Sequence, residues 1–242
     1  MIQNYKRRLY LAVQRWLGNE KLIFAPHGID VSVPPDADLK IRYDLARGRP
    51  YEGSEAAMII AHLPKSMPVI ELGGCLGIIS ALIRRQIGPD ATHIVVEANA
   101  ELAEFCRPNA MIGAADGATQ IVVAAVDYSG APSVSFSTGR MAHSGRVSAG
   151  GTMSVPTTTL AKLAAGLPDG PFALICDIEG AEMPLVLHET ALLARVAVFV
   201  LETHPKLYHG GKADMEALIA AVEKTGLRCV AQARNVYAFT RG

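Results

Sequence analysis

Three carboxylates lie at the ends of short apolar runs that are typical of buried strands. A glycine-rich turn over residues 73–77 follows Glu71, Glu97 ends the next apolar run, and Asp177 ends a third. Ligands of open α/β sheets bind outside the carboxyl ends of the strands, so we expect these side chains to face one crevice. Glycine lets a chain turn tightly and lets a ligand approach the backbone. The pattern predicts a nucleotide-type binding site.

The turn favours one kind of ligand over another. Glu97 stands where nucleotide-binding βαβ units place the acidic residue that binds a ribose. The turn is not G-x-G-x-x-G, however, and Glu71 would repel a pyrophosphate. A ligand with a cationic end suits it better, such as the ammonium and sulfonium of S-adenosylmethionine (SAM). The residues therefore predict a SAM site, with a nicotinamide-dependent oxidoreductase as an alternative.

Candidates for acid–base chemistry follow two of the apolar runs. Asp177 is the first, because a lone carboxylate that ends a core strand needs a partner. His204 is the second, because histidine titrates near neutral pH and emerges here at a strand end, before Pro205. His143 is the rival histidine. We predict Asp177 or His204 as the general base, and substrate contacts from Tyr208, His209 and residues 138–146.

Further acidic residues lie close to these candidates. Glu179 and Glu182 open the helix after Asp177, where they would either complement the helix dipole or join the site. Asp177, Glu179, Glu202 and His204 could instead gather a divalent cation, which prefers oxygen ligands. No spacing among them is diagnostic of a metal, so the predicted site contains none.

The elements that must position these residues form an alternating pattern from Pro68 onward, which predicts a doubly wound, mostly parallel α/β sheet. The apolar runs are 69–72, 93–97, 119–126, 172–178 and 196–202, and the helical patterns are about 78–87, 99–107, 157–165, 181–193 and 213–225. Runs 227–231 and 236–240 predict an antiparallel hairpin at one edge. Residues 127–156, rich in Gly, Ser and Thr, predict a binding loop or hairpin.

The first 50 residues read as an extension before a domain over residues 51–242. Residues 4–17 predict a basic amphipathic helix with Tyr5, Leu9, Ala12, Val13 and Trp16 on one face. Such a helix could lie on a membrane, join a partner or pack on its own domain. Residues 28–50 alternate apolar and polar side chains, which predicts a hairpin followed by a loop.

The composition limits the remaining possibilities. The 242 residues can bury one substantial core, and the formal charge balances to zero, so we expect no nucleic-acid partner. No apolar run is long enough to cross a membrane. Four cysteines without a C-x-x-C pair favour reduced thiols and a cytoplasmic location. A homo-oligomer is compatible with all of this.

Several of these segments, in their order, resemble the FkbM family of SAM-dependent methyltransferases. The glycine turn is followed by Val-Val-Glu-Ala-Asn at 95–99, and Thr-Thr-Leu at 158–160 precedes a strand. Ile-Cys-Asp-Ile-Glu-Gly-Ala-Glu at 175–182 is similar to the family's K-I-D-V-E-G-A-E signature. Tyr51-Glu52 and Glu55 are similar to its Y-E-x-x-E entry motif. The resemblance covers about residues 50–205.

The resemblance implies a Rossmann-like class I methyltransferase sheet of seven strands and methylation of a hydroxyl on a sugar, glycan or natural product. Glu71, Gly73 and Gly77 would hold the methionine end of SAM, Glu97 its ribose, and Asp177 would lie near the methyl group or the acceptor oxygen. The full set expected to bind the cofactor is Glu71, Gly73, Gly74, Gly77, Glu97, Ala98 and Asp177.

Two positions depart from the family pattern. Cys75 stands where the family commonly has Asn, which removes a polar contact near the cofactor. Cys176 stands where the family has Lys, so no lysine acts at that point. Because of Cys75, a non-catalytic SAM-binding protein on the same fold is a further alternative.

Overall fold

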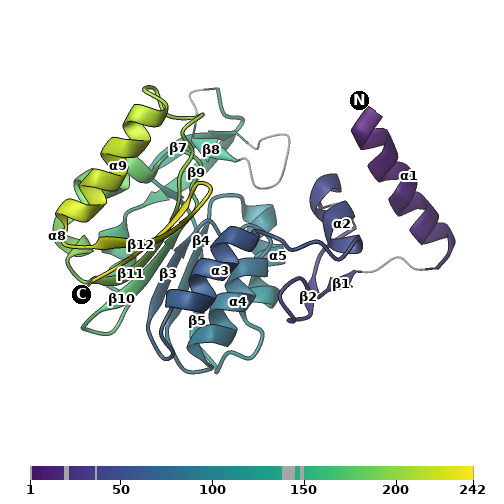
Figure 1. The fold of residues 1–242 in the computed structure, drawn as a ribbon, viewed down its shortest axis with the longest axis horizontal. Coiled ribbons are helices and arrows are strands. Elements are labelled where there is room, and N and C mark those ends of the chain that lie inside the picture. The colour runs from purple at the N-terminus through teal and green to yellow at the C-terminus, as the bar shows by residue number, and fades with distance from the viewer. Residues whose placement is uncertain (1, 19–21, 36, 138–144, 148–149, 242) are drawn as a thin grey trace.

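A seven-stranded sheet forms the centre of the computed structural model, which describes residues 2–18, 22–35, 37–137, 145–147 and 150–241 (Figure 1). The strand order is β12-β13-β11-β10-β3-β4-β5. The strands are β3 (Val69–Leu72), β4 (His93–Glu97), β5 (Thr119–Val123), β10 (Phe172–Cys176), β11 (Val196–Glu202), β12 (Arg228–Ala233) and β13 (Val236–Thr240). All neighbours are parallel except that β13 runs antiparallel to both β11 and β12. This is the predicted class I methyltransferase sheet with its antiparallel C-terminal edge hairpin.

Helices cover both faces of the sheet. The helices α3 (Gly53–His62), α4 (Ile78–Ile87) and α5 (Ala100–Ala110) cover one face, and α6 (Leu160–Ala164), α7 (Glu182–His188), α8 (Thr190–Leu193) and α9 (Lys212–Lys224) cover the other. Val69 packs against α3 and α4, whereas Ile70 and Leu72 pack in the cluster with α6 to α9. Burial on both faces explains why the parallel strands are continuously apolar rather than alternating.

The sheet changes direction at its centre. From β3 the chain proceeds outward to β4 and β5, and it later returns to place β10 on the other side of β3. The segments that leave β3 and β10 therefore diverge at the carboxyl edge, which is where this kind of sheet binds ligands. At that edge the backbone of Gly73 lies so close to the Asp177 carbonyl that a side chain on Gly73 would collide with it. Gly73 also has a φ of 101°, which favours glycine.

The N-terminal elements are α1 (Ile2–Trp16), β1 (Ile23–Phe24), β2 (Val31–Ser32) and α2 (Leu39–Ala46). The predicted loop before residue 50 is wrong, because α2 occupies it. The Asp38 carboxylate caps this helix by accepting hydrogen bonds from the N–H groups of Lys40 and Ile41, at 2.8 and 3.0 Å. Ile41 and Leu45 pack in a cluster with residues of α4, so the apolar core crosses the predicted boundary at residue 50.

A smaller sheet follows the central strands. It contains β6 (Ala125–Val126), β7 (Ser133–Ser137), β8 (Arg146–Val147) and β9 (Met153–Thr158), in the order β6-β9-β7-β8. The run predicted over 119–126 is divided between β5 and β6, and the helix expected from residue 157 begins at Leu160. Among the helices that the structure describes, none has the length and apolar character needed to span a bilayer.

Candidate functional site

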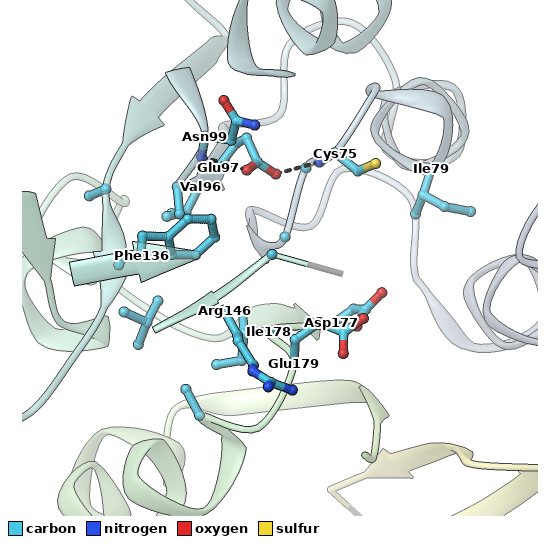
Figure 2. Close-up of a pocket in the computed structure, with 18 of the residues that line it drawn as sticks. Cys75, Ile79, Val96, Glu97, Asn99, Phe136, Arg146, Asp177, Ile178 and Glu179 are labelled. Atoms are coloured by element: carbon cyan, nitrogen blue, oxygen red, sulfur yellow. Dashed lines mark hydrogen bonds between the residues drawn. The ribbon is translucent and has the colours of Figure 1, made fainter. Parts of the chain in front are cut away.

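A cavity of about 1030 Å³, counted with its open mouth, lies at the carboxyl ends of β3, β4 and β10. Figure 2 shows Cys75 and Glu97 on one side of it and Asp177, Ile178 and Glu179 on the other. Five of the residues predicted to bind a cofactor line this cavity, namely Gly73, Gly74, Glu97, Ala98 and Asp177. The structure thus brings these five together at the point where the sheet reverses, whereas Glu71 and Gly77 do not line the cavity.

Glu97 is fixed by the backbone around it. Its two carboxylate oxygens accept hydrogen bonds from the N–H groups of Cys75 and Asn99, at 2.8 and 2.7 Å. Burial raises the pKa of the Glu97 carboxyl, and these hydrogen bonds oppose the rise. Each oxygen can accept a further hydrogen bond. A pair of neighbouring ligand hydroxyls therefore meets a preorganised acceptor here.

Packing explains two glycines of the turn. A side chain on Gly74 would meet Val95 at 2.6 Å, and one on Gly77 would meet the Cys106 carbonyl oxygen at 2.5 Å. Gly77, with a φ of 75°, precedes α4 and does not line the cavity. The close approach of α4 to α5 therefore requires glycine at this position whether or not a ligand binds.

Glu71 lies behind the cavity wall rather than in it. Its side chain is only 2% exposed, and its oxygens are bound by the Ser80 hydroxyl and by Nε2 of the buried His93, both at 2.9 Å. It points toward α4, on the opposite face of the sheet from Leu72. Its hydrogen bonds therefore give Glu71 a role in holding β3 against its neighbours. A direct contact between Glu71 and the cofactor stays a prediction.

Asp177 lies at the opposite wall, immediately after β10. Its Oδ1 atom is buried without a hydrogen-bond partner, and Nε2 of His204 lies 3.3 Å away. Burial, followed by the charge of Glu202, raises the pKa of the Asp177 carboxyl well above its usual range, and His204 opposes the rise. Because its pKa is raised, the Asp177 carboxylate is a stronger base than an ordinary aspartate. It also lines the cavity.

His204 stands behind Asp177 and does not line the cavity. Its Nδ1 atom lies 2.7 Å from Oε1 of the fully buried Glu182, whose Oε2 accepts a hydrogen bond from the Tyr208 hydroxyl at 3.1 Å. Burial alone would lower the pKa of His204. The hydrogen bond to Glu182 and the charge of Asp177 outweigh burial and raise that pKa to about 9. At neutral pH the ring is therefore an imidazolium, contrary to the reason for which it was predicted as a base.

Carboxylates outnumber cations around Asp177. Glu52, Glu55 and Glu179 also line the cavity, and Arg146 is the basic residue among its described lining. Glu55 is buried, and burial together with the charge of Asp177 raises the pKa of its carboxyl well above the usual range. The wall therefore favours a ligand that carries positive charge.

Sequence reasoning missed some residues of this site or named them only as part of a longer segment. Glu55 has a signal in the Y-E-x-x-E similarity, but no function could be attached to it from the sequence. Phe136, on β7, lines the cavity and was not predicted, because its segment carries little periodicity (Figure 2). Arg146, on β8, also lines the cavity and lies within the segment 138–146 that was predicted for substrate contacts. His143 lies outside the described residues, and His209 is exposed away from the cavity wall.

One group of side chains has the spacing for a cation. A ligand atom from each of Asp177, Glu179 and His204 lies within 4.8 Å of the others. The raised pKa of His204 disfavours this use, because a metal needs the neutral ring. The geometry is therefore compatible with a metal, but it is equally compatible with an ion pair between Asp177 and His204.

No protein-family model matches the chain, and no curated protein matches it in sequence. Similar solved structures include a TehB-like SAM-dependent methyltransferase from Corynebacterium glutamicum, 14% identical with a TM-score of 0.45, covering 84% of this chain and 95% of that one. A methyltransferase from Pyrococcus furiosus is 14% identical with a TM-score of 0.44 and full coverage of both chains. A protein of the NADB-Rossmann superfamily from Streptococcus agalactiae is 10% identical, with a TM-score of 0.45, covering 78% of this chain and 68% of that one.

These matches leave the activity to be argued from the site. At such identities they do not select between SAM and a nicotinamide nucleotide, and the strand order itself defines the fold. The resemblance to the FkbM family stays a prediction.

Proposed function

We propose that this chain is a SAM-dependent methyltransferase that methylates a hydroxyl on a sugar, glycan or natural-product acceptor. The observation that carries the proposal is the excess of carboxylates around Asp177 in a cavity at the sheet reversal. A pyrophosphate would add negative charge to this wall, whereas the sulfonium and ammonium of SAM would offset it.

The residues present fit SAM in two ways. The Glu97 carboxylate, held by two backbone N–H groups, can accept hydrogen bonds from the ribose hydroxyls. The backbone at Gly73 and Gly74 carries no side chain that would keep a ligand away from the wall. Ala98 and Asp177 complete the proposed cofactor contacts, and Asp177 faces the cationic end.

Asp177 is the proposed general base, and His204 is its positioning residue. When bound, SAM would supply a methyl group that its sulfonium already activates. The methyl group would pass to the acceptor oxygen with S-adenosylhomocysteine as the leaving group, and Asp177 would accept the proton of that hydroxyl. His204 is already protonated at neutral pH, so it holds Asp177 in place and is itself oriented by Glu182. Alignment can lower a barrier by about 7–11 kcal/mol, and a base adds roughly 10²–10⁴-fold.

A second hollow supports a polar acceptor. It adjoins the cavity through Tyr51 and Glu52, which line both, and its wall includes Lys40, Glu202 and Arg234. Charged and hydrogen-bonding side chains at this wall suit a molecule rich in hydroxyl groups better than an apolar one. This hollow is the proposed acceptor site.

The proposal is tested first by ligand binding and then by turnover. Titration with SAM, S-adenosylhomocysteine and NAD is monitored by thermal unfolding, and a ligand at 100 times its Kd stabilises by about 2.7 kcal/mol. We expect both SAM and S-adenosylhomocysteine to stabilise the chain and NAD to have no effect. Stabilisation by NAD alone would support the oxidoreductase instead.

Turnover separates an enzyme from a binding protein. The chain is incubated with SAM and a panel of hydroxylated sugars, glycans and natural products, and S-adenosylhomocysteine and the methylated product are measured together. We expect equal amounts of both for at least one acceptor. SAM binding without transfer to any acceptor would support the non-catalytic alternative.

A further inference from the structure

The helix α1 packs on the rest of the chain through its more polar side. In Figure 1 it lies beside α2, away from the sheet. The Tyr10 ring makes an edge-to-face contact with Tyr43, with ring centres 5.3 Å apart, and Arg7, Leu11 and Gln14 share this half-buried side. Successive residues turn by about 100°, so these four positions form one continuous face.

The opposite face of α1 is apolar and exposed. Tyr5 is 69% exposed, Leu9 52%, Val13 42% and Trp16 84%. In a helix that packs on its own domain, the apolar stripe faces the core. Packing on the domain was one of the alternatives for this helix, and the structure reverses its expected orientation. Leu17, immediately after the helix, is also exposed.

Positive charge borders this stripe on both sides. At 100° per residue, Lys6 lies at one edge, and Arg8 and Arg15 lie at the other. The helix contains no acidic residue, although the whole chain has a formal charge of zero. Long basic side chains at such edges can reach a polar layer while the stripe enters an apolar one. Aromatic side chains such as Tyr5 and Trp16 prefer that boundary.

We propose that α1 lies in the interface of an anionic lipid membrane, with the Tyr5–Leu9–Val13–Trp16 face buried among the acyl chains and the basic edges among the headgroups. An anionic bilayer offers an apolar interior bordered by negative charge along the whole helix. This matches the stripe and both of its edges. Membrane binding through α1 is independent of methyl transfer, so failure of either proposal leaves the other standing.

The chain carries its own probe for this proposal, because Trp16 is its single tryptophan. The full-length protein is titrated with vesicles of phosphatidylcholine alone and of phosphatidylcholine mixed with phosphatidylglycerol. With the anionic vesicles we expect a blue shift of the Trp16 emission, protection from acrylamide quenching and co-sedimentation, all weakened by salt. An emission that does not change with anionic vesicles would overturn the proposal.

Two variants separate the charged edges from the apolar face. The triple variant Lys6→Gln, Arg8→Gln, Arg15→Gln should weaken binding to anionic vesicles roughly 100-fold, since each basic residue contributes about 1 kcal/mol at such a surface. Leu9→Asp should abolish insertion, and it alters an exposed position, so folding should be retained. Leu187→Asp is the matched control, because Leu187 is 59% exposed on α7 and its replacement should leave vesicle binding unchanged.

Other occupants of the face give different results. Association of the wild-type chain with itself in the absence of lipid, abolished by Leu9→Asp, would assign the face to a second copy and overturn the membrane proposal. Equal binding of the wild type and the triple variant to both kinds of vesicle would show that the basic edges do not contribute. That result would also overturn the membrane proposal.

Discussion

Glu71 and Asp177 lie at the ends of two neighbouring parallel strands, β3 and β10, yet their surroundings differ. The Glu71 carboxylate is bound by Ser80 and His93 and is shielded from the cavity. Asp177 faces the cavity, and its buried Oδ1 atom lacks a hydrogen-bond partner. The Glu71 carboxylate is hydrogen-bonded within the protein, whereas the Asp177 carboxylate has His204 at 3.3 Å and no hydrogen bond to its Oδ1 atom, which leaves part of its interactions open to a ligand.

The difference teaches how to separate a structural carboxylate from a functional one. A buried charge is expensive unless hydrogen bonds and an opposite charge compensate it. Glu71 has hydrogen-bond partners in Ser80 and His93 in the folded chain, so removing it should affect stability. Asp177 has only part of it, because Glu55, Glu179 and Glu202 add like charge nearby. Removing Asp177 should therefore affect activity while leaving stability unchanged or improved.

Asp177→Asn gives the largest expected effect. We expect methyl transfer to fall about 10²–10⁴-fold, because the amide cannot accept the proton of the acceptor hydroxyl. Affinity for SAM should change far less, and the unfolding free energy should not decrease. Single-turnover rates, SAM titration and urea denaturation measure the three quantities. Asp116→Asn, in an exposed turn before β5, is the matched control and should behave as the wild type.

The same assay distinguishes the base from a metal. Activity that survives a chelator but is lost in Asp177→Asn would support the base. Activity that is lost with the chelator and returns with added magnesium would instead favour a cation at Asp177, Glu179 and His204.

Glu71→Ala should give the largest loss of stability. It leaves Ser80 and the fully buried His93 without their carboxylate partner, and each buried polar group left unsatisfied costs about 1–3 kcal/mol. Urea denaturation measures the change. Glu216→Ala removes a carboxylate that is 64% exposed and pairs with Lys212, and its effect should stay below about 1 kcal/mol. A stable Glu71→Ala chain that has lost SAM binding would contradict the structural role.

The pH dependence of the unfolding free energy tests the charge of His204 beside Asp177. The pKa of His204 rises from 6.5 to about 9 on folding, so its contribution is complete below pH 6.5 and is lost as the pH rises through 9. We expect the advantage of the wild type over His204→Gln to shrink by on the order of 2–3 kcal/mol across this window. Urea denaturation of both chains at several pH values measures the difference.

The comparison with His204→Gln reports on the ring together with the neighbours that it affects. Asp177, Glu179 and Glu182 surround the ring, and His204 lowers the pKa of the Asp177 carboxyl, so the change with pH belongs to this coupled group. An advantage that does not vary with pH would mean that His204 is neutral in the folded chain, and it would return His204 to candidacy as the base.

The sequence predicts the fold well because its signals are local. The strands at 69–72, 93–97 and 196–202 coincide with the observed bounds, since uninterrupted apolar runs are what a sheet buried on both faces requires. The helix α2 was missed because its buried apolar positions, Ile41 and Leu45, are few and follow a proline-rich turn. Its Asp38 cap was the available signal.

The sequence predicts which residues lie at one edge of the sheet, but it does not predict whether their side chains point into the cavity or away from it. Strand-end carboxylates look alike in sequence, whereas their partners are distant: His93 lies 22 residues after Glu71, and Glu182 lies 22 residues before His204. The same holds for the amphipathic α1. The sequence predicts the apolar stripe of α1. Which side of α1 contacts α2 depends on tertiary packing that no local pattern encodes.

Substitution of Cys75 gives the smallest expected effect and tests the side of the cavity where Glu97 is already hydrogen-bonded to the backbone. It has a φ of 45°, a left-handed conformation that asparagine tolerates better than most residues. Burial, followed by the charge of Glu97, raises the pKa of its thiol to about 12, so the side chain is uncharged at neutral pH. The preference for Asn in the resembling family then has two explanations, backbone conformation and cofactor contact.

Cys75→Asn separates these explanations when compared with Cys75→Ala. Backbone conformation alone predicts a gain of up to about 1 kcal/mol in unfolding free energy for Asn over Ala, with the same SAM affinity. A cofactor contact predicts tighter SAM binding by up to about tenfold, the worth of one hydrogen bond. We expect the first result, because the Cys75 N–H already binds Glu97 at 2.8 Å and fixes this part of the wall. Tighter binding in Cys75→Asn would instead mean that the wild-type site has lost a contact.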